Sequence, residues 1–207
     1  MLARGFPVAC VELGAALAEQ ARNLRGPVEV HVEPFETWDA GARTFALVYA
    51  ATAWHWIDPA IRYGKAHALL RPGGHLAFWS AQHAFPRGFD PFFAGIQDVY
   101  DAIGESHPGE AWPPPPPDEL PDASEEIEAS GLFTDLRVRR YVWEVPYTAD
   151  EYVSLLETFS GHMSMDAAKR TILYGEIRRR IGARADPRVR RHWCAILHVV
   201  RRREIER

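Results

Sequence analysis

Hydrophobic and polar residues in the first part of the chain follow a pattern that predicts strands separated by helices. Short apolar runs at 6–13 and 27–35 have the length and the β-branched content of strands. The alanine-rich segment between them has helical spacing and ends at Gly26. A continuous apolar run at 44–54 is typical of a strand that is covered on both faces.

A second helix is predicted directly after this run. Asp58 is expected to be its N-cap and Pro59 its first residue, and the helix should continue to about Leu70. The sequence RPGG at 71–74 predicts a turn, which leads into a strand at 75–80. The order strand, helix, strand, strand, helix, strand predicts an α/β fold with a parallel sheet.

The second half of the chain is predicted to mix helices and strands less regularly. The five consecutive prolines at 113–117 require extended backbone, because proline fixes φ and lacks an amide donor. Thr148 and Glu151 have the spacing of a capping box, which predicts the start of a helix. The remaining predicted elements are a helix at 89–104, a short helix at 125–133 that is ended by Gly131, a helix at 165–182, and strands at 136–145 and 193–203.

The composition is that of an ordinary globular protein. The chain has 207 residues, of which 47% are hydrophobic and 25% charged, enough for one α/β domain or two small ones. No apolar stretch reaches the roughly 20 residues of a membrane helix, and the N-terminal segment lacks a signal-peptide pattern. Cys10 and Cys194 lie far apart in apolar surroundings. We therefore expect reduced thiols, no metal site and a cytoplasmic location.

Positive charge is concentrated at the C-terminal end. The formal net charge is −4, yet residues 175–207 contain eleven arginines and four acidic residues. A basic tail can bind nucleic acid. The simpler interpretation is a solvated helix face and turn, whose arginine stems lie on apolar surface. No RNA-binding signature accompanies the arginines, so we do not expect nucleic acid as a partner.

Four segments, taken in order, resemble the class I S-adenosylmethionine-dependent methyltransferases, in particular the methyltransferase type 11-like group. They are VACVELGAALAEQAR, VEVHVEPFETW, FALVYAATAWHWIDP and LLRPGGHLAFW. The resemblance implies a Rossmann-like sheet, mostly parallel with an antiparallel last strand, and S-adenosylmethionine as the cofactor. It covers nearly the whole chain as a single domain, with 1–83 as the cofactor-binding half, 84–135 as a helical and proline-rich insertion or lid, and 136–207 as the C-terminal strands and helices.

The resemblance also implies which residues bind the cofactor. Glu12, with Leu13 beside it, falls on the acid that ends the family's second strand and binds the ribose hydroxyls. Phe35 and Glu36 fall in the loop that holds the adenine. We expect these residues to meet at the carboxyl ends of the strands, where open α/β sheets bind their ligands.

The exit of the family's fourth strand carries two tryptophans and a histidine. Ala50 and Ala51 fall where the family contacts the methionine part of the cofactor. Trp54 and Trp56 are expected to bind substrate, because aromatic faces attract a sulfonium cation. His55 is a candidate catalytic base, since an imidazole titrates near neutral pH. The alternative is that the tryptophans pack in the core and that His55 hydrogen-bonds a backbone carbonyl.

The family's glycine-rich loop does not occur in this sequence. In the family, the first strand ends in a G-x-G-x-G loop that approaches the cofactor, whereas no G-x-G occurs here. In the family's strand order, three-two-one-four-five-seven-six, the first strand is central. Its absence would leave the strands at 6–13 and 44–53 about 10 Å apart, given the ~4.8 Å strand spacing. The two strands could close up, another segment could lie between them, or the reading frame could start late; we favour the late start, an N-terminal truncation before the loop.

The sequence therefore predicts S-adenosylmethionine-dependent methyl transfer to an unidentified small-molecule acceptor, impaired in a chain that lacks the glycine-rich loop. The alternative is a non-catalytic remnant of the methyltransferase fold, or an interaction module. A membrane is not expected as a partner. The acceptor, its nucleophilic atom and the oligomeric state stay open at this point.

Overall fold

The computed structural model describes residues 1–24, 26–106 and 112–204. The chain divides into two compact units, which are described separately. Unit 1 comprises Met1–Ser80, Ala123–Val138 and Leu197–Arg207, and unit 2 comprises Ala81–Asp122 and Arg139–Ile196. Parts of the predicted insertion (107–111) and of the basic tail (205–207) lie outside the described residues. No helix in the described ranges combines the length and the apolar character needed to cross a bilayer.

Unit 1 begins with a small parallel sheet. After the short 3-10 helix η1 (Leu2–Arg4), strand β1 (Val8–Val11) pairs in parallel with β2 (Val28–His31). Helix α1 (Ala15–Arg22) connects them. This confirms the strand, helix and strand predicted from the first apolar runs.

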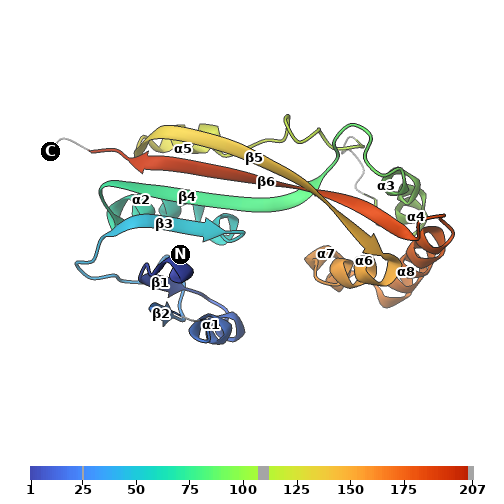
Figure 1. Ribbon diagram of the computed structural model, residues 1–207, viewed down its shortest axis with the longest axis horizontal. Helices are drawn as coiled ribbons and strands as arrows, with labels where there is room; N and C mark the ends of the chain where they lie inside the picture. The colour runs from blue at the N-terminus through green and yellow to red at the C-terminus, as the bar shows by residue number, and fades with distance from the viewer. Residues whose placement is uncertain (25, 107–111, 205–207) are drawn as a thin grey trace. The chain divides into compact units, whose positions relative to one another are not determined.

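A larger sheet has the strand order β3-β4-β6-β5. Its strands are β3 (Phe45–Ala51), β4 (Leu70–Ala84), β5 (Phe133–Thr148) and β6 (Arg188–Arg202). Strands β3 and β4 are parallel. Figure 1 shows the arrow of β6 running opposite to those of β4 and β5, which confirms the antiparallel last strand.

Two helices of unit 1 begin or end where the sequence predicts. Helix α2 (Pro59–Leu69) follows the short 3-10 helix η2 (Trp54–Trp56), and the Asp58 carboxylate caps α2 by accepting the Ala60 amide at 2.8 Å. Helix α5 (Ser124–Ser130) ends at Gly131, whose φ of 66° is left-handed and favours glycine. Each boundary is set by the residue that caps the helix, Asp58 for α2 and Gly131 for α5.

Strand β4 begins earlier than predicted. The sequence RPGG was expected to form a turn before the strand, but β4 starts at Leu70 and includes it. The pairing with β3 moves from Phe45–Leu70 to Leu47–His75, so the extra residues of β4 form a bulge. Gly73 has a φ of 70°, a conformation that glycine adopts without steric cost.

Strand β3 is less buried than its apolar sequence predicts. Residues along it alternate between partly buried and exposed, and the Tyr49 side chain is 42% exposed. Tyr49 stacks on Trp79 of β4, with ring centroids 6.2 Å apart. Because exposed residues recur along β3, the expectation that β3 is covered on both faces is wrong.

Strands β1 and β3 belong to different sheets. No backbone pairing joins them in the described part of the chain. They meet instead through a hydrophobic cluster around buried Trp38, which includes Val11 of β1 and both Phe45 and Val48 of β3. The two strands therefore have not closed up into one sheet, which was one of the three alternatives for the missing central strand.

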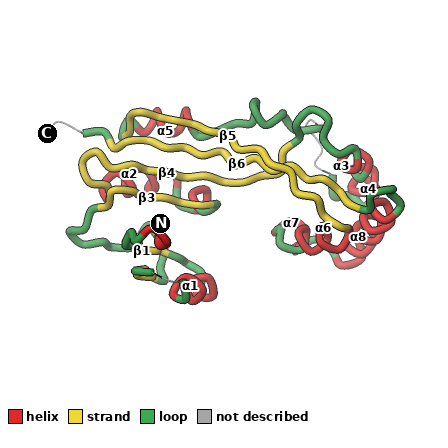
Figure 2. The backbone as a smooth tube through the Cα atoms, in the orientation of Figure 1, coloured by secondary structure: helices red, strands yellow, loops and turns green. Residues whose placement is uncertain are grey.

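Unit 2 combines helices with one end each of β4, β5 and β6 (Figure 2). Its helices are α3 (Phe92–Gly95), α4 (Gln97–Ala102), α6 (Ala149–Leu156), α7 (Ser160–Ser164) and α8 (Ala167–Gly182). The predicted capping box is confirmed, since Thr148 and Glu151 exchange side-chain to backbone hydrogen bonds of 2.8 and 3.3 Å. The single helix predicted at 89–104 is divided in two after Gly95, a poor helix former.

Candidate functional site

The first predicted cofactor residue lies where β1 ends. Glu12 follows Val11 directly, and its backbone amide donates to the His31 carbonyl of β2 at 3.0 Å. Its carboxylate Oε1 accepts the Gly14 amide at 2.7 Å, at the N-terminus of α1. A carboxylate is favoured there because the first amides of a helix lack partners within it. Leu13 points outward and is 71% exposed.

The loop after β2 carries the second pair of predicted residues. Phe35 is half-buried against the Trp38 cluster, with the Lys65 ammonium 5.4 Å from its ring centroid. Glu36 Oε1 accepts the backbone amide of Asp58 at 2.9 Å. This hydrogen bond joins the loop after β2 to the beginning of α2, shortly after the two tryptophans.

Lys65 of α2 holds the same loop and was not singled out from the sequence. Its ammonium donates to the carbonyl of Glu36 at 2.9 Å and to that of Trp38 at 2.5 Å. Two backbone carbonyls that would otherwise lack partners are satisfied in this way. In the sequence, Lys65 is one polar position on a helix, and no local signal indicates that it reaches a loop 27 to 29 residues earlier.

The chain turns sharply after β3. Ala50 and Ala51 pair with Phe78 and Trp79 of β4. The next residue, Thr52, has a φ of 53° and donates its amide to the Trp79 carbonyl at 2.7 Å. A positive φ is uncommon for a β-branched residue and costs of the order of 1–3 kcal/mol. The predicted methionine-binding end of the strand is therefore locally strained.

The two tryptophans of η2 have different environments. Trp54 is 5% exposed and stacks on Phe78, with centroids 4.9 Å apart, and Tyr63 lies edge-on at 5.3 Å. Trp56 is 78% exposed and contacts the ring of His55 at 4.8 Å. The side chain of Trp54 is thus occupied by core packing, as the alternative interpretation expected, and the predicted aromatic wall depends on Trp56.

His55 is exposed beside Trp56. Within the described residues its side chain forms no hydrogen bond, so the expected bond to a backbone carbonyl is not formed. No hydrogen bond or ring contact joins Glu12 to η2 in the described part of the chain. The structure therefore links the loop after β2 to the N-cap of α2, while Glu12 is linked to that loop through the pairing of β1 with β2.

A polar cluster that contacts η2 was also not predicted from the sequence. The buried guanidinium of Arg62 donates to the Trp54 carbonyl at 3.1 Å and forms an ion pair with Glu126 of α5. The Tyr63 hydroxyl donates to the same Glu126 carboxylate at 3.3 Å, and burial raises the pKa of Tyr63 to about 12. These contacts fix the position of Trp54. The two contacts with Glu126 span more than sixty residues of sequence, so no local pattern indicates them.

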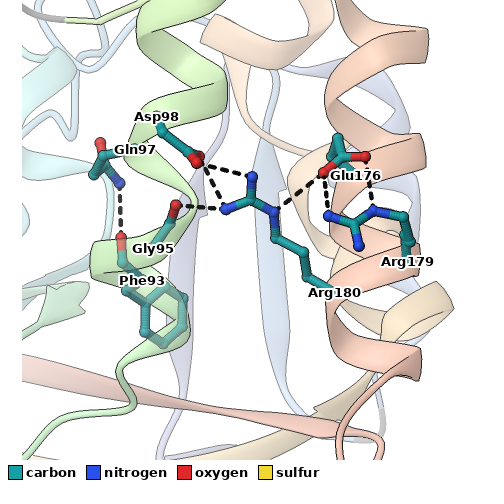
Figure 3. A network of polar contacts seen from close by, with 7 residues as sticks. All are labelled: Phe93, Gly95, Gln97, Asp98, Glu176, Arg179 and Arg180. Atoms are coloured by element: carbon teal, nitrogen blue, oxygen red, sulfur yellow. Dashed lines mark hydrogen bonds and ion pairs between the residues drawn. The ribbon is translucent and has the colours of Figure 1, made fainter.

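Several arginines of the basic tail form ion pairs within unit 2. Arg180 donates to the Gly95 carbonyl at 2.6 Å and pairs with Asp98 of α4 and with Glu176 of its own helix (Figure 3). The other pairs are Arg178 with Asp150, Arg179 with Glu176, and Arg184 with Asp90. These contacts support the structural interpretation of the basic segment.

Comparisons with known proteins identify the fold. No known family profile matches the chain, and no curated protein sequence does. A solved structure from Anaeromyxobacter dehalogenans, provisionally described as a type II methyltransferase, is 21% identical, with a TM-score of 0.60 over 94% of this chain and 80% of that one. A methyltransferase from Bacillus halodurans, also provisionally described, is 15% identical, with a TM-score of 0.50 over 95% and 83%.

The chain therefore has the fold of the class I S-adenosylmethionine-dependent methyltransferases. This confirms the predicted fold class. The strand orders agree as well: the β1-β2 pair and the order β3-β4-β6-β5 correspond to the expected order without its central strand.

Proposed function

We propose that this protein is an S-adenosylmethionine-dependent methyltransferase that acts on a small-molecule acceptor. The shared fold supports the reaction class. The observation that carries the proposal is the 2.9 Å hydrogen bond between Glu36 Oε1 and the Asp58 amide. Because of this bond, the loop expected to hold adenine lies against the turn expected to face the acceptor, at the edge where such sheets bind ligands.

The residues at this edge fit the cofactor. Glu12 Oε2 forms no hydrogen bond within the described residues, so it can accept ribose hydroxyls while Oε1 stays on the Gly14 amide. Phe35 offers a half-buried ring for the adenine, in a loop held by Lys65. Leu13, next to Glu12, and Ala50 and Ala51, at the end of β3, are assigned to the same cofactor surface. When bound, S-adenosylmethionine supplies an electrophilic methyl group.

The remaining chemistry is assigned to η2. Methyl transfer from a sulfonium is an in-line displacement, so most of the catalysis comes from holding the acceptor at attack distance. The exposed indole of Trp56 is suited to line that position, and an indole face also attracts a sulfonium. His55, exposed beside it, would accept the proton of a hydroxyl or amine acceptor.

A second candidate function is a non-catalytic module with the methyltransferase fold. It is favoured by the lack of strand pairing between β1 and β3 in the described residues, and by the absence of G-x-G from the sequence. Without a glycine-rich loop, fewer backbone amides are available to the cofactor. This candidate predicts that the chain does not bind S-adenosylhomocysteine.

Isothermal titration with S-adenosylhomocysteine separates the two candidates. The methyltransferase proposal expects saturable heat for the wild type and a loss of about tenfold in affinity for Glu12→Gln, because hydrogen bonds to a charged group contribute ~1.5–3 kcal/mol. Glu19→Gln on the exposed face of α1 is the matched control and should bind like the wild type. A wild-type chain that gives no heat would refute the proposal and favour the non-catalytic module.

A further inference from the structure

Within its described residues, unit 2 contains a buried cation without a counter-charge. Arg191 of β6 is only 5% exposed, and it forms no ion pair within the described residues. Its Nε has no hydrogen-bond acceptor, and its Nη1 reaches the Tyr152 hydroxyl only at 3.5 Å. A guanidinium stays protonated in proteins, and a buried charge is costly unless it is paired.

The other contacts of Arg191 are with aromatic rings. Its guanidinium carbon lies 4.4 Å from the ring centroid of Trp193 and 5.3 Å from that of Phe159. Cation–π contacts stabilise a guanidinium. Burying an ion costs more than such contacts return. The rings therefore offset only part of the free-energy cost of burying the charge. A bound anion would offset the rest.

Neighbouring ionisable groups do not supply that anion. Burial lowers the pKa of Arg191, and the strongest opposing effects come from the phenols of Tyr152, Tyr147 and Tyr100. Burial, aided by the charge of Arg191, also lowers the pKa of His83 to about 3 and lowers that of His162. Both imidazoles are thus neutral at pH 7.

The carboxylate that raises the pKa of His162 already forms an ion pair with another residue. Glu105 raises the pKa of His162 slightly against the effect of burial, but its Oε1 is bound to the Lys169 ammonium at 2.8 Å. His162 in turn shares a 3.0 Å hydrogen bond with the Tyr100 hydroxyl. The surroundings of Arg191 therefore consist of neutral hydroxyls, neutral imidazoles and aromatic faces.

We propose that Arg191 binds the carboxylate of a small organic acid whose apolar body packs against Trp193, Phe159 and Tyr152. A guanidinium presents a planar fork that matches a carboxylate, and one negative charge balances it. A phosphate dianion would leave an excess charge in an aromatic environment.

Titration without cofactor tests the proposal on the full chain. Benzoate and hexanoate are the carboxylate probes, benzamide is the neutral isostere of benzoate, and inorganic phosphate tests the other anion class. We expect the carboxylates to bind at least tenfold more tightly than benzamide or phosphate. Equal binding of benzamide and benzoate, or tighter binding of phosphate, would overturn the proposal.

Substitutions then assign the binding to Arg191. Arg191→Met should weaken benzoate binding by tenfold or more, while Arg190→Met, which removes the same charge from the adjacent exposed position, should leave it within twofold. Equal losses in both variants would indicate general charge attraction and contradict the assignment.

Thermal unfolding shows whether Arg191→Met still folds. Replacing an unpaired buried charge by an apolar side chain of similar length is expected to keep or raise Tm. Benzoate should raise the Tm of the wild type but not that of Arg191→Met. A wild type that neither binds nor is stabilised by any carboxylate would refute the proposal. Failure of S-adenosylhomocysteine binding with benzoate binding intact would refute only the proposed methyltransferase function.

Discussion

The indole of Trp54 stacks on the ring of Phe78, with centroids 4.9 Å apart and planes inclined by 16°. The stack joins η2 to β4 in the core of unit 1, which also contains Leu76, Phe133 and Val200. Two residues later, Trp56 is almost fully exposed. The same residue type therefore serves stability at one position and is free for ligand contact at the other.

This difference predicts that two matched substitutions have different effects on the free energy of unfolding. Trp54→Ala should lower the free energy of unfolding by about 3–5 kcal/mol, because it leaves a cavity beside Phe78 and Tyr63. Trp56→Ala should change it by less than about 0.5 kcal/mol and, under the proposed function, should weaken binding of S-adenosylhomocysteine. Urea unfolding and titration measure the two effects. A large loss of stability in Trp56→Ala would contradict the structure.

The bond between Glu36 and Asp58 gives a second prediction. Glu36→Ala removes the acceptor of the Asp58 amide and should lower the free energy of unfolding by about 1–2 kcal/mol. Glu36→Gln keeps a carbonyl oxygen at the same place and should retain most of that stability. Urea unfolding of both variants checks this, and an alanine variant as stable as the glutamine variant would show that the bond has no role.

Asp90 of unit 2 provides a third prediction. Its carboxylate is buried and accepts the Phe92 and Arg190 amides at 3.0 Å each and the Arg184 guanidinium at 2.9 Å. Although burial raises the pKa of Asp90, these hydrogen bonds lower it overall. Asp90→Ala should destabilise the protein by about 3–5 kcal/mol, because it leaves buried donors and a cation without an acceptor.

The control for this substitution is Asp186→Ala. Asp186 lines the same surface cavity of unit 2 as Asp90 and Arg184, but its side chain is exposed and forms no ion pair in the described residues. Its replacement should be nearly neutral. Comparable losses of stability in the two variants, measured by urea unfolding, would show that burial of Asp90 is not the cause.

His83 predicts a dependence of stability on pH. Burial lowers its pKa to about 3, while the pKa in the unfolded chain is near the reference value of about 6.5. The unfolded state therefore binds a proton that the folded state does not. Its contribution to stability is fully present above pH 6.5 and is lost as the pH falls toward 3, by up to about 1.4 kcal/mol per pH unit.

The measurement is urea unfolding between pH 7 and pH 5 for the wild type and for His83→Phe. The phenylalanine ring can replace the contacts of His83 with Phe85 and Phe93. The variant should lose less stability on acidification than the wild type. Some dependence should persist, because burial lowers the pKa of His162 in the same direction. Identical pH profiles would show that His83 titrates normally.

Sequence patterns predicted most elements because helix and strand boundaries depend on nearby residues. The N-cap of α2 at Asp58, the capping box of Thr148 and Glu151, and the left-handed end of α5 at Gly131 are all confirmed. The bulge in β4 was missed because RPGG has the composition of a turn. Only pairing with β3 decides that these residues stay within the strand.

Candidate site residues were predicted by position, and their environments were not. The family resemblance assigned Glu12, Phe35 and Glu36 to strand ends, and parallel strands end at a common edge. The sequence could not say that Trp54 packs inward and Trp56 outward, since both orientations fit a short 3-10 turn. It also could not indicate Lys65, whose two acceptors lie in a distant loop.

The amino-acid sequence by itself determined the α/β class, the caps and the succession of helices and strands along the chain, because these follow from hydrophobic periodicity and from local backbone chemistry. Only the tertiary structure decided which charges are compensated. Arg180 and Arg191 occur in one basic segment, yet Arg180 meets Asp98 and Glu176, whereas Arg191 is enclosed by aromatic rings. The energy of a charge depends on its burial and its partners, and those partners are brought together by packing between elements that are far apart in the chain.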